Sequence, residues 1–220
     1  LQSQTCAAPL PGSSACTVVL LFRPSSEQDT AGTLSVRAAP GGMVQATLRG
    51  RGSRFVSLGR LGGTSADSVN SVAFDDAGNV IASGFFRSSV NFGSGEVSSV
   101  GLYDAFVSKY DPQGTLLWSK QFGSPDGDHA LAVAADVDRN VLVAGYFNGT
   151  VSFGGGPLTS AGSADIYVAK YTAAGAHIWS KRLGGVDNDQ PLAMAVDSAG
   201  NIFLSGYFYQ SVDFGAGSVT

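Results

Sequence analysis

Hydrophobic and polar positions along this chain alternate in short runs, and the runs come in pairs. Residues 71–74 (SVAF) and 79–86 (NVIASGFF) flank a DDAGN segment, whose Asp, Gly and Asn residues favour a tight turn. A second pair, residues 104–110 (DAFVSKY) and 115–121 (TLLWSKQ), flanks DPQG. No segment shows an apolar period typical of a helix. The pattern therefore predicts two β-hairpins and an all-β fold.

The whole pattern recurs at a spacing of 61 residues without a gap. Turn residues recur together with the strands, so the repeat preserves the hairpins and is more than a periodicity of composition. The Gly-rich stretch at 154–157 (GGGP) also recurs, as GSGE and GAGS, which predicts a repeated turn. The main recurring polar and aromatic positions are Asp67, Asp128 and Asp189; Asp75, Asp136 and Asp197; Asn79, Asn140 and Asn201; and Trp118 with Trp179.

Each repeat unit is predicted to form one four-stranded up-and-down sheet. The units span about residues 61–121, 122–182 and, incompletely, 183–220. Tandem four-stranded sheets are typical of a β-propeller, in which the blades pack face to face around an axis. Because a propeller needs four to eight blades, the ring cannot close within this chain. We expect a longer native molecule, or missing sheets supplied by neighbouring chains.

The repeat also resembles a known family. The segments VAFDDAGNVIASGFF, VNFG and DAFVSKY, restated sixty-one positions later as VAADVDRNVLVAGYF, VSFG and DIYVAKY, are similar to the bacterial β-propeller repeat called SBBP. The resemblance covers residues 61–220. It implies blades in a secreted or cell-surface protein, with no single activity attached.

The preceding segment resembles a different domain. Residues 6–52, with ACTVVLLFRPSS, GTLSVRAAPGG and ATLRGRG, are similar to the C-terminal part of the Ig-like choice-of-anchor D (ASH-like) domain, a β-sandwich. The N-terminal strands of such a domain are missing. We therefore predict a partial Ig-like sandwich over residues 1–54 and propeller repeats over residues 55–220.

Composition and charge agree with a β-rich protein and exclude some partners. Charged residues make up only 14%, hydrophobic residues 44%, and there are 30 glycines. The net charge of -4 gives no field that would hold a polyanion, so nucleic acid is not an expected partner. The strongest apolar run, residues 17–22, is far too short to span a bilayer, so we expect no membrane insertion.

The cysteines, Cys6 and Cys16, flank a loop rich in Pro, Gly and Ser. A disulfide is the favoured reading, and it would place the protein outside the cytoplasm. Two free thiols are the alternative. A zinc pair lacks the other ligands that a tetrahedral site requires.

The recurring aspartates allow two interpretations. The D-x-D pairs ending in Asp128 and Asp189 suggest calcium, but the first unit has Ser65 in place of the first Asp, and no bidentate Glu follows. The stronger interpretation is that Asp67 and its counterparts accept backbone N–H bonds in the loops between blades. Asp75 and its counterparts are predicted to shape the hairpin turns.

No catalytic, cofactor or metal-binding constellation emerges. His129 and His177 break the repeat, yet no nucleophile motif accompanies either, and each is expected to be a surface residue. Trp118 and Trp179 share one repeat position and are read as blade packing, with a sugar platform as the alternative. Whether the protein is an enzyme is left open, with a non-enzyme favoured.

The sequence thus favours an extracellular or cell-surface structural and interaction module. Its partners would be another protein or further blades of the same polypeptide, and carbohydrate stays an option. The alternatives are part of a secreted propeller lyase or hydrolase, or an adhesin dependent on carbohydrate or calcium.

Overall fold

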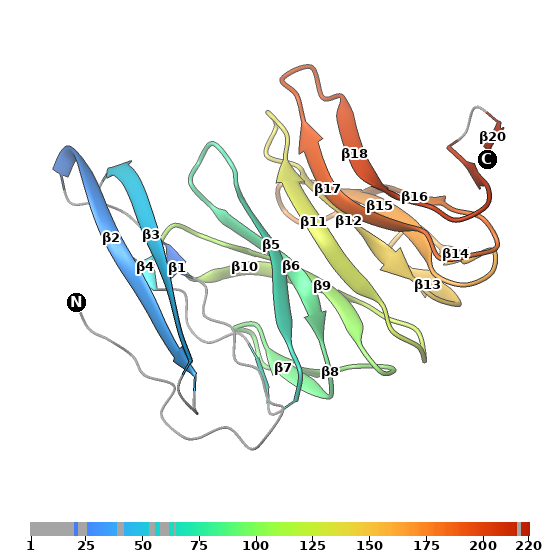
Figure 1. Cartoon of the computed structure of the whole chain (residues 1–220), viewed down its shortest axis with the longest axis horizontal. Coiled ribbons are helices and arrows are strands. Elements are labelled where there is room, and N and C mark those ends of the chain that lie inside the picture. Colours follow the sequence, from blue (N-terminus) through green and yellow to red (C-terminus); the bar gives the residue numbers. More distant parts are fainter. Residues whose placement is uncertain are drawn as a thin grey trace.

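The computed structural model describes residues 62–63, 65–214 and 217–220, and the strand backbones within residues 20–57. Figure 1 shows sheets that follow one another along the long axis of the molecule, from green through yellow and orange to red. No helix of these residues is long and apolar enough to cross a bilayer. The described elements are all β-strands, as the sequence predicts.

The first two repeat units each form a four-stranded antiparallel sheet in the order of the chain. Blade 1 consists of β5 (Ser68–Phe74), β6 (Val80–Phe86), β9 (Asp104–Tyr110) and β10 (Leu116–Phe122). Blade 2 consists of β11 (His129–Ala135), β12 (Val141–Phe147), β15 (Asp165–Tyr171) and β16 (His177–Leu183). The third unit contributes one hairpin, β17 (Gln190–Val196) and β18 (Ile202–Tyr207). The predicted four-stranded sheets are confirmed, and the sheets form no closed ring.

A small hairpin that the sequence analysis treated only as a turn lies between the second and third strands of each unit. These hairpins are β7 (Ser89–Asn91) with β8 (Glu96–Ser98), β13 (Thr150–Ser152) with β14 (Pro157–Thr159), and β19 (Val212–Asp213) with β20 (Ser218–Val219). Each Gly-rich turn lies at a hairpin tip, where Gly93 and Gly95 adopt φ of 123° and 120°. Such φ values favour glycine, which explains why the turn chemistry recurs.

The first strand of each unit (β5, β11 or β17), which we call the inner strand, carries a β-bulge at one repeat position. In blade 2 the bulge lies between Ala130 and Ala132. Opposite the bulge lies a recurring glycine. A Cβ built on Gly145 would lie 1.9 Å from the backbone oxygen of His129 and 2.8 Å from the Tyr167 ring. The equivalent Gly84 and Gly206 are equally confined by backbone oxygens. The bulge therefore requires glycine at this repeat position.

Each blade has two faces. In blade 1 the front face holds Val80 and Phe86 and the back face holds Ile81 and Val107, and the equivalent positions define the two faces of the other units. At the first junction, the back face of blade 1 packs on the front face of blade 2. At the second junction, the back face of blade 2 packs on Met194 and Leu204 of the third unit. Inner strand β11 lies against both β5 and β17. The units therefore stack face to face, as propeller blades do.

Four further strands precede the blades. β2 (Ser26–Ala38) pairs antiparallel with β3 (Gly42–Gly52), and β1 (Leu20–Leu21) pairs antiparallel with β4 (Val56–Ser57). The Ig-like sandwich is not shown by these two pairs and stays a prediction.

Candidate functional site

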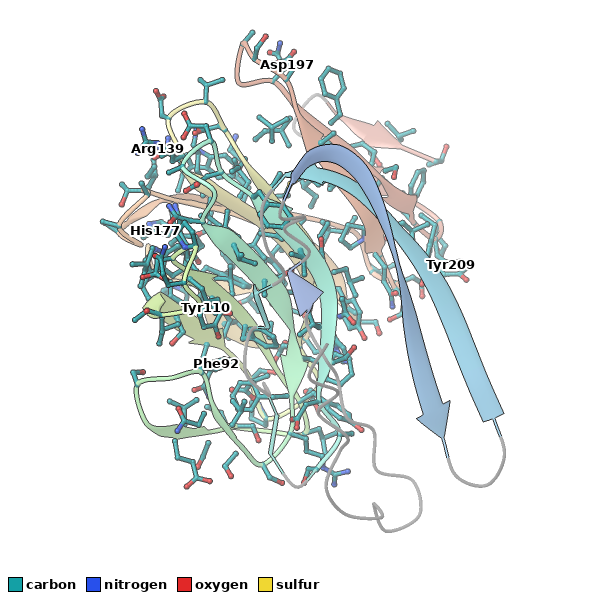
Figure 2. The ribbon with its side chains drawn as sticks, turned by 90° about the vertical axis from the view of Figure 1, so that its left-hand side faces the viewer. Phe92, Tyr110, Arg139, His177, Asp197 and Tyr209 are labelled. Atoms are coloured by element: carbon teal, nitrogen blue, oxygen red, sulfur yellow. The ribbon has the colours of Figure 1, made fainter. Side chains whose placement is uncertain are left out.

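The blades have two chemically different ends. The turn end carries the tight hairpin turns at residues 75–79, 111–115, 136–140, 172–176 and 197–201. The crossover end carries the small hairpins and the loops that lead from one blade to the next. Figure 2 labels Asp197 at the turn end of the third unit, and Tyr209 lies away from it, where β18 has ended.

At the turn end, the recurring Asp and Asn residues form a closed hydrogen-bonded box. Asp136 Oδ1 accepts the backbone N–H groups of Asp138 and Asn140, each at 2.9 Å, and its Oδ2 accepts from the Asn140 side chain at 2.9 Å. Asp75 with Asn79, and Asp197 with Asn201, make the same three bonds. These carboxylates therefore have a structural role in shaping the turns.

A buried lysine joins this box to the next blade. Lys109, with a side chain only 1% exposed, lies 2.9 Å from Asp75 Oδ2. Its ammonium also donates to the carbonyl oxygens of Arg139 and Ala173, both in turns of blade 2. Burial raises the pKa of Asp75, but hydrogen bonds from Asn79 and Lys109 outweigh it and hold the pKa below the ordinary value. The charged pair thus ties blade 1 to blade 2.

At the crossover end, the other aspartate series binds backbone N–H groups from two loops. Asp128 Oδ2 accepts from Ser124 at 2.6 Å, and its Oδ1 accepts from Asn148 at 2.9 Å. Burial raises the pKa of Asp128 above its ordinary value despite these bonds. Asp67 and Asp189 bind the equivalent pairs of N–H groups. Each carboxylate therefore links the loop that enters a blade to the loop that leaves the second strand.

The arrangement of the acids gives no support to the calcium interpretation. Asp126, the partner of Asp128 in its D-x-D pair, is exposed, while both oxygens of Asp128 already accept N–H bonds. Within residues 62–220 as described, no three His, Cys, Asp or Glu side chains gather where they could hold a metal ion. The Cys6 and Cys16 pair lies outside the described residues.

The two tryptophans lie at the junctions between units. Trp118 Nε1 donates to the Ala173 carbonyl of blade 2 at 3.0 Å, and its ring packs beside Gly175. Trp179 is partly buried against the core of the second junction. The Trp118 ring therefore contacts the neighbouring blade, and the Trp179 ring packs on the back face of its own blade.

A set of aromatic side chains at the crossover end was not predicted from the sequence. One of the repeat positions that are aromatic in all three units holds Phe85, Tyr146 and Tyr207, each at or one residue before the end of the second strand. Each is the cross-strand partner of the first residue of its inner strand, which is Ser68, His129 or Gln190. The spacing of sixty-one positions in the sequence was the available signal. We call Phe85, Tyr103, His129, Tyr146, Tyr207 and Tyr209 the aromatic row.

His129 occupies the middle of the aromatic row, where neighbouring rings partly bury it, so it is not the free surface residue that was expected. Its ring centre lies 4.3 Å from that of Phe85 and 4.7 Å from that of Tyr146, on which it stacks. Tyr103 packs against both His129 and Phe85. Burial lowers the pKa of His129 to about 4, so the ring is neutral at pH 7.

The row continues onto the third unit, where it becomes exposed. The ring of Tyr207 lies 5.7 Å from that of Tyr209, which is 57% exposed. Tyr146 is close enough to Tyr207 for its pKa to be affected: burial raises the pKa of Tyr146, and Tyr207 adds to the rise. The row thus consists of two groups of contacting rings, one around His129 and one formed by Tyr207 with Tyr209.

Comparison with known proteins finds a family that matches one segment of the chain. The family described as Beta-propeller repeat (SBBP) matches residues 178–207, which run from the last strand of blade 2 to the end of β18. Blades 1 and 2 show the same unit at a spacing of sixty-one residues.

Two curated relatives are much longer proteins. The chain is 26% identical over 180 residues to an uncharacterised WD repeat-containing protein of Acanthamoeba polyphaga mimivirus, covering 68% of this chain. It is 33% identical over 110 residues to the regulatory protein FlaEY of Caulobacter vibrioides, covering 48% of this chain. The matched segments span only 13% and 12% of those relatives.

Proposed function

We propose that this β-propeller repeat module serves as a structural and interaction module, and that its two outermost blade faces bind further blades of the same kind. The observation that carries the proposal is a comparison of equivalent positions. In β18 and β5, side chains whose counterparts are buried where two units meet are exposed where no described unit covers them, whereas Val80 and Phe86 of the same front face are buried with Val90 and Phe92.

The back face of the third unit supports this proposal. Phe203 in β18 is 60% exposed, whereas its counterpart in blade 2, Leu142, is 0% exposed. Ile81, the counterpart in blade 1, is also fully buried. An exposed Phe at a position that holds core residues in the other units supports an interaction face here.

The front face of blade 1 supports it from the other side. Val72 in inner strand β5 is 43% exposed, whereas its counterpart Val133 is 6% exposed in the first junction. Phe74, two residues further along β5, is also exposed. At both internal junctions a back face packs on a front face, and the two uncovered faces are one of each kind: the back face of the third unit and the front face of blade 1. A further blade therefore fits either face, whether the same polypeptide or another copy supplies it.

The proposal extends to the location of the module. We propose a secreted or cell-surface protein in which the repeats follow an Ig-like sandwich. The support is the resemblance of residues 6–52 and the Cys6 and Cys16 pair. An intact mass after alkylation without reduction checks the disulfide, because two alkylated thiols would contradict it.

Light scattering of the 220-residue chain over a range of concentrations tests the blade-binding proposal. We expect an average mass that rises with concentration, and a Phe203→Asp variant that stays closer to a monomer. Ile178→Asp is the matched control, since Ile178 and its blade-1 counterpart Leu117 are both exposed, so no neighbouring blade covers this position. A wild-type chain that stays monomeric at every concentration and unfolds cooperatively would overturn the proposal.

A further inference from the structure

The crossover end presents rings in a regular series. Phe85, Tyr146 and Tyr207 supply one ring per unit from one repeat position, and His129 lies between the first two. Phe85 and Tyr146 stay partly exposed although each is flanked by a neighbouring unit. The exposure of the row is therefore a property of this end of the stack, and a further blade beside the third unit would leave the row accessible.

Tyr209 extends the row outward. Its counterparts differ: Arg87 in blade 1 is exposed although blade 2 lies beside it, whereas Asn148 in blade 2 is partly buried and donates to the Gly127 carbonyl. The backbone N–H of Tyr209 is held by Asp189, which fixes the start of its loop. Tyr209 therefore presents a positioned ring and a phenol hydroxyl to solvent.

Hydrogen-bonding groups accompany the rings. The hydroxyls of Tyr146, Tyr207 and Tyr209 make no hydrogen bond to another described residue. His129 Nε2, unlike its buried Nδ1, is reached by solvent. A ligand for the row would thus offer apolar faces to the rings and hydroxyl groups to these atoms.

Charge indicates which such ligand fits. Asp126 is exposed in the loop before blade 2, and Asp187 lies in the equivalent loop before the third unit, where it accepts from Gln210. Arg87, over the ring of Tyr103, is the cation at the blade-1 end of the row. Carboxylates along a row with so little positive charge repel a polyanion.

We propose that the aromatic row binds a neutral glycan chain. The apolar faces of sugar rings pack on exposed aromatic rings, which Tyr207 and Tyr209 supply, and sugar hydroxyl groups can pair with the phenol hydroxyls of these residues. The proposal is independent of blade binding, because it uses the crossover end and not the blade faces.

Titration calorimetry with neutral hexasaccharides of glucose, N-acetylglucosamine, xylose and mannose tests the proposal, with oligogalacturonate as the anionic comparison. At least one neutral hexasaccharide is expected to bind. Loss of one stacked ring in Tyr209→Ala should weaken binding roughly tenfold. Tyr209→Phe should lose less, because it keeps the ring.

Phe203→Ala is the matched control, since it removes an exposed ring from the same unit but from the back face. It should bind the glycan as the wild type does. Binding of the anionic oligosaccharide alone, binding of none of the set, or equal binding by wild type and Tyr209→Ala would each overturn the proposal. A change in self-association without loss of glycan binding would bear only on the blade faces.

Discussion

The two junctions between units are built from the same repeat, yet they differ in how much of each blade face the neighbouring unit covers. At the first junction, all four strands of blade 1 pack on β11, β12, β15 and the small hairpin of blade 2, and Phe122 is buried against Phe153 and Tyr171. At the second junction, only β17 and β18 face blade 2, and Leu183, the counterpart of Phe122, is partly exposed. The outer half of a blade face is thus covered only when the neighbour supplies its outer strands.

The lysines at the turn end show the same contrast. Lys109 is bound by Asp75 and by two carbonyl oxygens of blade 2, and its side chain is 1% exposed. Lys170, its counterpart, lies 2.8 Å from Asp136, but its side chain is 21% exposed. The repeat therefore fixes the ion pair within each blade, and the neighbouring blade decides whether that pair is buried.

Truncating the core at the two junctions should give the largest difference. Phe122→Ala leaves a cavity among aromatic rings and is expected to lower the free energy of unfolding by about 3–5 kcal/mol. Leu183→Ala, at the partly open second junction, should cost about 1–2 kcal/mol, because solvent already reaches the site. Urea unfolding of both variants measures the difference. Equal losses would show that the junctions are equally packed.

Removing the lysine charge should give the next largest effect. Lys109→Met leaves the buried Asp75 carboxylate without its cation and should cost about 3 kcal/mol. Lys170→Met should cost about 1 kcal/mol or less, since water reaches the Asp136 pair. Unfolding midpoints at low and high salt provide the measurement. If Lys170→Met were as costly as Lys109→Met, burial by the next blade would not be what strengthens the pair.

A methyl group at the bulge glycine tests how rigid each unit is. Gly145→Ala places a Cβ against the His129 backbone oxygen in a sheet packed on both sides, so we expect a loss of about 2 kcal/mol. In the third unit, β18 has no third strand beside it and can shift, so Gly206→Ala should cost about 1 kcal/mol or less. Amide hydrogen exchange in β12 and β18 reports the two effects separately. Faster exchange in β18 alone would contradict the expectation.

The sheet of each blade could be predicted from the sequence because turn chemistry and alternation repeat together. Residues 104–110, predicted as a strand, are the observed β9. The small hairpins were missed because β7 and β8 are only three residues each, and their Gly-rich link was all that the pattern revealed. A strand of three residues gives too little alternation to be distinguished from a turn.

The aromatic row could not be predicted from single residues. His129 reads as isolated in the sequence, and only the stacking of blade 1 on blade 2 places it between Phe85 and Tyr146. By contrast, the Asp136 box depends on residues within four positions, so its local hydrogen bonds could be inferred directly. Interactions within a turn are encoded locally, whereas interactions between blades depend on how the units pack.

The difference between His129 and its counterpart Gln190 gives the smallest expected effect, a pH dependence specific to the first junction. Burial lowers the pKa of His129 from 6.5 to about 4, so the unfolded chain binds a proton more readily than the folded one between these values. Stability from the neutral ring is therefore complete above pH 6.5 and decreases as the pH falls toward 4. At pH 5.5 the loss relative to pH 8 should be about 1 kcal/mol.

His129→Gln, which installs the residue of the second junction, isolates this contribution from the nearby carboxylates. Asp128 has a raised pKa, and its protonation in acid changes stability in the opposite direction in both proteins. The difference between wild type and His129→Gln, measured by urea unfolding from pH 8 to pH 5, therefore reports the histidine alone. Because a charged imidazolium would have to lie between Phe85 and Tyr146 without a hydrogen-bond partner for Nδ1, the wild type should lose more stability on acidification than the variant. Parallel pH profiles for the two proteins would mean that the His129 ring is solvated in the folded state and does not close the first junction.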